Sequence, residues 1–410
     1  MFRPPLGANE LRLGTRAFKA DPYPAYARLR NEKPVLRVTL PDRRIAWLVT
    51  RFEDVASLLR DPRFVKDKKN ALTPEELGRE PWMPRMFRPL TRNMLDVDAP
   101  DHGRLRGIVQ KGFTPRLVEG MAERIQAVAD RLLDGIGSGG RFDLIRDYAL
   151  PIPTTIIAEM LGVPTEDQNR FHRWSRVIVA ADPSGSGMVR AVPSVMKFLR
   201  YIRRLIERRR ADPRDDLISA LVQAEEEGQR LNSDELVAMI FLLLVAGHET
   251  TVNLIGNGTL ALLENPDQLE FLRADADLGP KAIEELLRFD GPLEFATERY
   301  AREGVEIRGA TIPRGDLVYA VLASANRDER QFPDPDVLNL SRDPNRHLAF
   351  GLGVHFCLGA PLARLEGRIA LTTLLRRAPD LCLAAPSTTL RRRPGLVLRG
   401  LESLPVLLRK

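Results

Sequence analysis

The feature that most constrains the fold of this chain is its longest apolar run, over residues 236–263. Asn232 and the acidic Glu235 precede the run, and they provide the side-chain cap and negative first turn with which a helix begins. Ile240 and Leu243 recur at helical spacing, and the middle of the run is apolar on every side. A helix of this kind crosses a protein interior, and we expect the run to be too short and too soon interrupted by polar residues to span a membrane.

A short polar motif, A-G-H-E-T-T over residues 246–251, stands in the middle of this run. Gly247 weakens a helix by about 1 kcal/mol relative to alanine, and a buried Glu249 needs a partner. Thr250 can donate to the carbonyl one turn earlier, which bends the helix and opens a groove. A groove with a hydroxyl and a carboxylate can hold dioxygen and pass protons, whereas the alternative is a capping or interhelical polar cluster. Both interpretations stay open on this motif alone.

A glycine-rich loop, F-G-L-G-V-H-F-C-L-G-A over residues 350–360, leads into a predicted helix over 361–375. Its glycines, which are Gly351, Gly353 and Gly359, let the backbone take positive φ values and lie flat against a large group. Cys357 stands just before the helix, where free N–H groups favour a thiolate. Shielded by Phe350 and Leu358, that thiolate is a soft ligand suited to a haem iron.

Other uses of Cys357 have to be compared with this one. A lone cysteine is often a small buried hydrophobe. Zinc needs four nitrogen or sulfur ligands, and only His355 and Cys357 are near in sequence. The C-x-x-C-H motif of covalent haem attachment is absent. A Cys/His nucleophile stays open, although the segment offers no third group to orient it.

The pattern F-G-x-G-x-H-x-C-x-G-A followed by L-A-R-x-E resembles the haem-ligating loop of a bacterial cytochrome P450. The resemblance implies a mainly α fold with small β-sheets (α+β), a single triangular helical domain over residues 1–410 that encloses haem b. It also implies that Cys357 is the axial ligand of the haem iron and that His355 hydrogen-bonds a propionate. Phe350, Gly351 and Gly359 would contact the cofactor.

The same resemblance gives the polar motif a role on the opposite side of the haem. It implies that Ala246 and Gly247 contact the cofactor, that Glu249 relays protons and that Thr250 stabilises peroxide at the iron. These two residues are the expected catalytic pair, and their work is general acid–base chemistry.

Two cations, His102 and Arg106, are spaced i and i+4 and therefore share a helix face. Alone, such a pair is a solvated basic face. Under the resemblance His102, Arg106 and Arg299 bind the haem propionates.

Glu285 and Arg288 are i and i+3 neighbours on a helix that follows Gly279. An exposed pair of this kind stabilises little. In the family such a pair binds an arginine of a later irregular segment, and here a segment of that type ends at Arg342. We therefore expect Glu285 and Arg288 to be structural.

Composition agrees with one large helical domain. The chain has 410 residues, 44% of them hydrophobic, and no linker, repeat or low-complexity stretch divides it. Further helices are predicted over residues 24–30, 101–112, 116–134, 165–179 and 189–209. The clearest strands are predicted over residues 46–50, 305–308 and 317–321.

The formal charge of +7 does not indicate nucleic-acid binding, because basic residues are interleaved with 55 acidic ones and no aromatic-basic platform is present. Two cysteines fit a reducing compartment, and the N-terminus has neither signal peptide nor anchor. We expect a cytoplasmic monomer. With no length left for a fused redox domain, the resemblance implies electrons from a ferredoxin and an NAD(P)H-dependent ferredoxin reductase. Arg346, Arg364 and Arg368 are candidates for docking such a carrier, and ordinary solvated helix faces are the alternative for each of them.

The expected substrate pocket is apolar. Its predicted walls include Met86, Phe87, Val177, Leu243, Ala246, Leu293, Phe295 and Ala296. The motif G-P-L-E-F-A-T-E-R resembles the bacterial subgroup that includes macrolide hydroxylases, which indicates O2-dependent hydroxylation or epoxidation of a polyketide, terpenoid or fatty acid. A peroxygenase or isomerase without electron partners, and a haem sensor without catalysis, are the alternatives.

Overall fold

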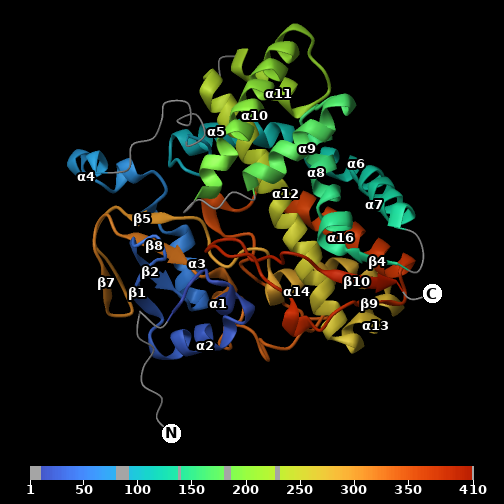
Figure 1. The fold of residues 1–410 in the computed structure, drawn as a ribbon. Coiled ribbons are helices and arrows are strands. Elements are labelled where there is room, and N and C mark those ends of the chain that lie inside the picture. The colour runs from blue at the N-terminus through green and yellow to red at the C-terminus, as the bar shows by residue number, and fades with distance from the viewer. Residues whose placement is uncertain (1–10, 80–91, 137–139, 180–185, 227–230, 409–410) are drawn as a thin grey trace.

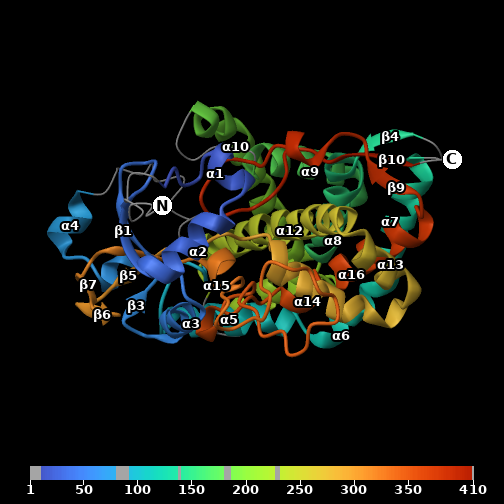
Figure 2. The same ribbon diagram turned by 90° about the horizontal axis from the view of Figure 1, so that it is seen from below.

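A computed structural model of the chain describes residues 11–79, 92–136, 140–179, 186–226 and 231–408. Helices form most of the molecule, and a sheet region with the first helices lies at one side of them (Figure 1). The central helix α12 (Ser233–Glu264) runs through the middle of the helical part in both views (Figure 1, Figure 2). The predicted mainly helical fold with small sheets is confirmed.

The other helices surround α12. They are α1 (Arg16–Ala20), α2 (Tyr23–Glu32), α3 (Phe52–Arg60), α4 (Pro74–Gly78), α5 (Asp101–Gly112), α6 (Pro115–Gly120), α7 (Ala122–Ile136), α8 (Pro151–Met160), α9 (Thr165–Val179), α10 (Ser186–Ala211), α11 (Leu217–Glu226), α13 (Pro266–Ala274), α14 (Gly279–Asp290), α15 (Leu322–Ala325) and α16 (Ala360–Arg377).

The strands form small sheets. They are β1 (Val35–Thr39), β2 (Ile45–Val49), β3 (Phe64–Val65), β4 (Arg141–Asp143), β5 (Arg299–Ala301), β6 (Val305–Ile307), β7 (Ala310–Ile312), β8 (Leu317–Ala320), β9 (Leu381–Leu383) and β10 (Pro405–Leu408). The largest sheet has the order β1-β2-β8-β5-β3, in which only β2 and β8 are parallel. A second sheet, β4-β10-β9, joins the C-terminal strand to the helical part, and β6 and β7 form a hairpin.

α12 begins with a capping box, in which Asn232 accepts from the Glu235 N–H and the Glu235 carboxylate accepts from the Asn232 N–H. Among the described helices it alone is long and apolar enough to cross a membrane, contrary to the expectation from sequence. However, 72% of its apolar stretch is buried inside the protein, as in the core helix of a soluble protein.

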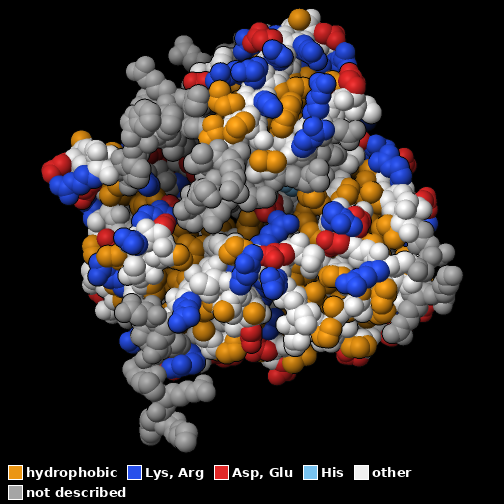
Figure 3. Space-filling view, in the orientation of Figure 1, with side chains coloured by type: hydrophobic (Ala, Val, Ile, Leu, Met, Phe, Trp, Pro, Cys, Tyr) orange, Lys and Arg blue, Asp and Glu red, His pale blue; other side chains and the backbone are white. Residues whose placement is uncertain are grey.

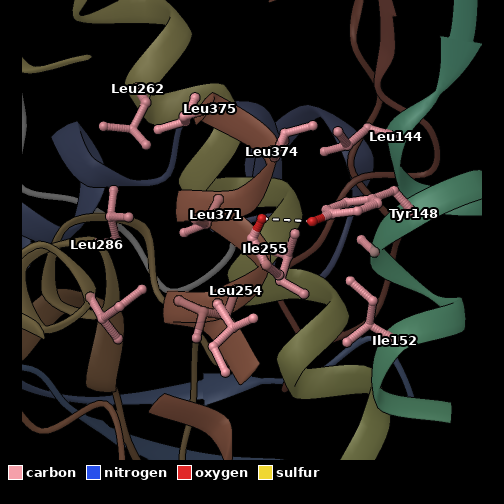
Figure 4. Close-up of a cluster of buried hydrophobic side chains, with 14 of the residues drawn as sticks. Leu144, Tyr148, Ile152, Leu254, Ile255, Leu262, Leu286, Leu371, Leu374 and Leu375 are labelled. Atoms are coloured by element: carbon pink, nitrogen blue, oxygen red, sulfur yellow. Dashed lines mark hydrogen bonds between the residues drawn. The ribbon is translucent and has the colours of Figure 1, made fainter. Parts of the chain in front are cut away.

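The main core lies where α12 contacts α14, α16, α8 and the π-helical turn η3 (Ile145–Ala149) (Figure 4). Leu254 and Ile255 of α12 lie between Leu371 of α16 and Tyr148 of η3. The Tyr148 hydroxyl donates to the Ala370 carbonyl at 2.7 Å, so this buried polar group is satisfied. The apolar contacts hold α16, and therefore the loop before it, against α12.

Several predicted elements match the structure, including the helices over 101–112 and 165–179 and the strands over 46–50, 305–308 and 317–321, within one residue. The single helix predicted over 116–134 is wrong. The helix is interrupted between α6 and α7, where the Met121 N–H donates to the Val118 carbonyl in a tight turn after Gly120. α8 is absent from the predicted helices because Pro151 and Pro153 argue against a helix in the sequence. Both prolines lie in its first turn, where proline is tolerated.

A buried ion network around Glu285 fixes the irregular segment that precedes the cysteine loop. Arg288 donates twice to the Glu285 carboxylate at 2.7 Å, and Arg342 donates to both of its oxygens at 3.2 Å. Arg288 also donates to the Asn326 and Pro335 carbonyls at 3.0 and 2.8 Å. The network thus holds the segment 326–342 from one helix.

The first helix is tied to the C-terminal segment. The Lys19 ammonium donates to the Leu398 carbonyl and, at 2.6 Å, to the Gly395 carbonyl. Arg399 in turn donates to the Lys19 carbonyl at 2.8 Å. Because Lys19 and Arg399 are both buried, these contacts fix the first helix to the segment 395–399.

Replacing Glu285 with Gln should lower the free energy of unfolding by about 3 to 5 kcal/mol, because Arg288 and Arg342 are left with uncompensated charge in a dry site. The measurement is thermal or urea unfolding of the haem-loaded protein. The exposed Glu306→Gln on β6 is the matched control and should change little. A loss no larger for Glu285→Gln than for the control would show that the network does not hold the segment.

Candidate functional site

The cysteine loop is shaped by two glycines with positive φ, Gly351 at +70° and Gly353 at +76°. A side chain at Gly353 would meet the Leu59 carbonyl of α3 at 2.8 Å, so this turn requires glycine. Gly359 differs from the expectation, because its φ is −80° and it caps α16. A Cβ at Gly359 would meet nothing within 4 Å. The loop therefore leaves open space beside Gly359.

Cys357 lies between these turns and α16. Its N–H donates to the Phe350 carbonyl at 2.9 Å, and the residue is exposed. Burial among surrounding atoms raises the pKa of the Cys357 thiol, and the Gly359 N–H, Arg106, Arg364 and the Ala360 N–H oppose that rise. Within the protein alone the sulfur thus keeps its proton, while the helix start and the cations favour a thiolate as soon as a positive centre binds it.

One face of α12 is accessible although the helix is mostly buried. Leu242, Ala246 and Thr250 are spaced four residues apart and are all partly or fully accessible. The Thr250 hydroxyl donates to the Ala246 carbonyl at 2.9 Å. Gly247 lies off this face, since its missing side chain would contact Ile157 of α8 at 3.6 Å. Of the predicted pair, Ala246 is exposed and Gly247 is partly exposed.

Glu249 is buried beside the accessible face and pairs with Arg393 at 3.0 Å. Burial raises the pKa of Glu249 to about 7, and Arg393 opposes the rise. Arg393 is itself partly exposed. Glu249 therefore gains and loses a proton near neutral pH, and its partner reaches toward solvent.

Basic side chains from the cysteine loop, α5, β5 and the residue after β3 form a cluster. The rings of His102 and His355 lie 4.2 Å apart, and Lys66, Arg106 and Arg299 are near enough to lower the pKa of His355. Burial, followed by the charges of these neighbours, lowers the pKa of His355 to about 2. Burial also lowers the pKa of Lys66 to about 7 and that of Arg299 to about 10. The predicted residues His102, Arg106, Arg299 and His355 are thus brought together.

Two donors in this cluster have no hydrogen-bond partner in the described part of the chain. They are His102 Nε2 and Arg299 Nε, and both residues are buried. Unsatisfied buried donors are rare and costly, so they indicate an acceptor that the protein does not supply. The two carboxylates of haem b provide such acceptors, and the open space beside Gly359 and the accessible sulfur suit the rest of the group. The residues present therefore fit haem.

The predicted pocket walls have mixed outcomes. Met86 and Phe87 lie outside the described residues. Val177 is exposed, and Leu293 and Ala296 are partly exposed. Phe295 does not face open space, because its ring is 1% exposed and packs edge-on against Tyr319 at 5.5 Å. Leu243 is likewise buried in the helical core, since the open face of α12 instead carries Leu242 and Val245.

Three residues near the site were missed from sequence. Lys66 follows β3, Arg393 belongs to the basic run 391–393, and Glu366 follows the cysteine loop on α16. Glu366 is the last residue of the L-A-R-x-E motif. Its carboxyl is buried with one oxygen unpartnered, and burial raises its pKa to about 8, with a side-chain hydrogen bond to Thr251 opposing the rise. A glutamate at an otherwise apolar helix position was the available signal.

The cations expected to dock an electron carrier are not equivalent. Arg364 is paired with both oxygens of Glu284 at 2.7 and 2.8 Å and stacks on Phe350 at 4.4 Å. Arg346 and Arg368 are exposed. Arg364 therefore supports the loop, and the other two present charge to solvent.

Comparison with known proteins gives consistent matches over nearly the whole chain. The family model for Cytochrome P450 matches residues 168–278 and 273–378. Cytochrome P450 107B1 of Saccharopolyspora erythraea is 45% identical over 392 residues, which cover 95% of this chain and 96% of the relative. Polyketide biosynthesis cytochrome P450 PksS of Bacillus subtilis is 42% identical over 96% of this chain and 98% of its own length.

Solved structures agree with these matches. The PksS structure covers all of both chains at 41% identity with a TM-score of 0.89. A myxobacterial cytochrome P450, CYP267B1, in complex with myristic acid is 44% identical and has a TM-score of 0.89, covering 96% of this chain and 98% of that one.

Replacing Glu366 with Gln should stabilise the protein near pH 8 by about 2 kcal/mol or more and change little near pH 5. The raised pKa means that the folded state keeps a proton that the unfolded chain releases, so the stability contributed by this carboxyl is complete below its unfolded pKa and is lost as pH rises toward about 8. Thermal unfolding at both pH values measures the effect, with the exposed Glu303→Gln as control. Equal shifts at the two pH values would contradict a protonated Glu366.

Proposed function

Because this chain belongs to the cytochrome P450 family of haem-dependent monooxygenases, we propose that its Cys357 supplies the thiolate that ligates the haem iron. The side chain is accessible at the start of α16, with the N–H groups of Gly359 and Ala360 close to the sulfur. A bound iron centre would oppose the rise that burial causes, lower the pKa of the thiol and favour the thiolate.

The observation that carries this proposal is the pair of unsatisfied donors beside the cysteine loop. His102 Nε2 and Arg299 Nε would donate to propionate carboxylates, and Arg106 and Lys66 would add positive charge around them. Burial lowers the pKa of His102, His355 and Lys66, and repulsion from neighbouring basic groups lowers it further, so their charged forms are unfavourable without an anion. Two carboxylates placed among them would reverse that repulsion, so the cluster favours this ligand over a neutral one.

Haem, when bound, supplies the reductive activation of dioxygen, and the enzyme returns its substrate with one added oxygen atom as hydroxyl or epoxide. The chain's own residues bind and orient the substrate and deliver protons. Thr250 Oγ1 lies on the accessible face of α12 and can donate a hydrogen bond toward that space instead of to Ala246. Glu249, with a pKa near neutrality, can replace the proton that leaves, and Arg393 links it to solvent.

We propose a polyketide or fatty acyl compound as the substrate. The accessible face of α12 offers Leu242, Val245 and Ala246, and Leu293 and Ala296 are partly exposed apolar residues of the segment before β5. Such a lining binds an apolar compound through buried area and needs few polar contacts. The relatives named above include one assigned to polyketide biosynthesis and one bound to myristic acid, which supports this class.

Monooxygenases of this family need separate redox partners, and we propose a ferredoxin with an NAD(P)H-dependent reductase, in the cytoplasm. An acidic ferredoxin would dock near the exposed Arg346 and Arg368. Arg364 would contribute little, because Glu284 already neutralises it.

Replacing Cys357 with Ser should abolish the strongly red-shifted carbonyl Soret band of the reduced protein, because a hydroxyl oxygen donates far less electron density than a thiolate. Absorption spectra of the reduced protein under carbon monoxide measure this. Cys382→Ser is the matched control, since Cys382 lies on β9, and it should keep the band. A normal band in Cys357→Ser would remove the ligand assignment.

Replacing Thr250 with Ala should lower the ratio of product to reductant consumed about tenfold or more and release peroxide instead, because a positioned proton donor is lost. Turnover with a surrogate ferredoxin system, with product and peroxide both quantified, measures the ratio. Thr251→Ala is the neighbouring control, since Thr251 is buried and faces Glu366. Full activity of both proteins with hydrogen peroxide alone would favour the peroxygenase alternative.

A further inference from the structure

A row of exposed cations runs along α10. Lys197, Arg200, Arg204 and Arg208 are all exposed, and their spacing of three, seven and eleven residues from the first places them on one face. At 100° and 1.5 Å per residue the row is about 80° wide and about 17 Å long. We call these four residues the α10 stripe. Figure 3 shows Lys and Arg side chains gathered over this part of the molecule, at the top of the view.

The stripe is not neutralised by the part of the chain that the structure describes, where none of its four members forms an ion pair with a carboxylate. The nearby carboxylates instead form ion pairs with neighbouring arginines outside the stripe. Arg209 is buried in a pair with Asp216, and Arg203 approaches Asp234 at 3.5 Å. Like charges at i and i+4 destabilise a helix by about 0.2–0.5 kcal/mol per pair, so the stripe is unfavourable for α10 itself.

The surface beside the stripe is not purely polar. A hollow of about 570 Å³ is lined by Met196 and Leu199 together with Arg200, Arg204 and Arg208. Arg203 and Glu207 complete its rim. An apolar floor within a cationic rim matches the composition of a protein interface, where apolar contact gives affinity and charge gives orientation. A nucleic acid would match the rim but offers no side chains for the floor.

The stripe lies away from the surface expected to receive electrons. α10 packs on α9, α11 and α12, whereas the cysteine loop leads into α16, and α12 lies between α10 and α16 in both views (Figure 1, Figure 2). A carrier on α10 would have α12 between itself and Cys357. The exposed Arg346 and Arg368, in contrast, belong to the segment before the cysteine loop and to α16.

We propose that the α10 stripe docks an acidic protein other than the electron carrier, which presents carboxylates from one helix at the spacing of the stripe. The length of the row exceeds what a small anion can contact, and a helix with Glu or Asp at i, i+3, i+7 and i+11 matches it residue for residue. The proposal rests on the proposed function only in assigning electron transfer to the side of Cys357.

The probe is a synthetic helical peptide with Glu at those four positions and Leu on the adjoining face, and its control is a scrambled peptide of the same composition. Fluorescence anisotropy measures binding to the full-length, haem-loaded protein at low salt. We expect the triple variant Arg200→Glu, Arg204→Glu, Arg208→Glu to bind at least about tenfold more weakly than the parent, because three attractive charges become repulsive.

The matched control is Lys33→Glu, Arg37→Glu, Lys69→Glu, which changes the net charge equally at exposed positions in the sheet region. It should bind the peptide like the parent. The milder set Arg200→Gln, Arg204→Gln, Arg208→Gln should lie between, and it replaces the charge reversal if that protein does not fold.

Four results would overturn the proposal. They are equal weakening in the control, equal binding of the scrambled peptide, tighter binding of a single-stranded RNA that displaces the peptide, and loss of reduction by ferredoxin in the stripe variant. The carbonyl spectrum separates these results from a failure of the proposed function. If Cys357 does not ligate the iron, the parent and every stripe variant will lack the red-shifted carbonyl band alike. Peptide binding will then be unchanged.

Discussion

The buried carboxylate of Glu285 is the interaction on which the cysteine side of the molecule depends. It receives six hydrogen bonds from Arg288, Arg342, Asn339 and Asn345 at distances of 2.7 to 3.2 Å. Through them a helix with regular geometry fixes a long segment that has almost none. Such a segment has no ladder of its own, so its backbone groups must be satisfied by side chains. Arg288 and Arg342 do this by donating to its carbonyls, and the loop that carries Cys357 follows directly.

The electrostatics on the other side of the site have the opposite character. Around Glu285 opposite charges compensate one another, whereas around His355 basic groups accumulate. The charge of Asp98 opposes the lowering of the pKa of His102 and Arg299. A protein tolerates that arrangement when a ligand supplies the missing charge. Binding of the dianionic group should therefore contribute to folding stability as well as to chemistry, since it acts on the native state alone. In the proposed site, the open sulfur and the crowded basic groups are two parts of one ligand site.

The sequence was a good guide where side chains act through short, regular spacing. The helix over 101–112, the capped start of α12 and the Thr250 bond to Ala246 all follow from local rules. It was a poor guide where the outcome depends on which way a helix is rotated. Leu243 was predicted to line the pocket, yet it is buried in the helical core, and the open face carries Leu242 and Val245 instead. Arg393, Lys66 and Phe295 could not be placed because their neighbours are far away in sequence. α8 was not predicted because its two prolines disfavour a helix interior, although they do not destabilise the first turn in which they lie.

The tie between Lys19 and the segment 395–399 has a consequence for how the chain acquires its structure during synthesis. A five-residue helix such as α1 is too short to be stable alone, and the carbonyls that receive its buried ammonium lie 376 and 379 residues later in the chain. Until the segment 395–399 has been made, Lys19 has no carbonyls to bind, and α1 cannot dock stably. The docking of α1 is therefore delayed until a segment almost 380 residues later has been synthesised.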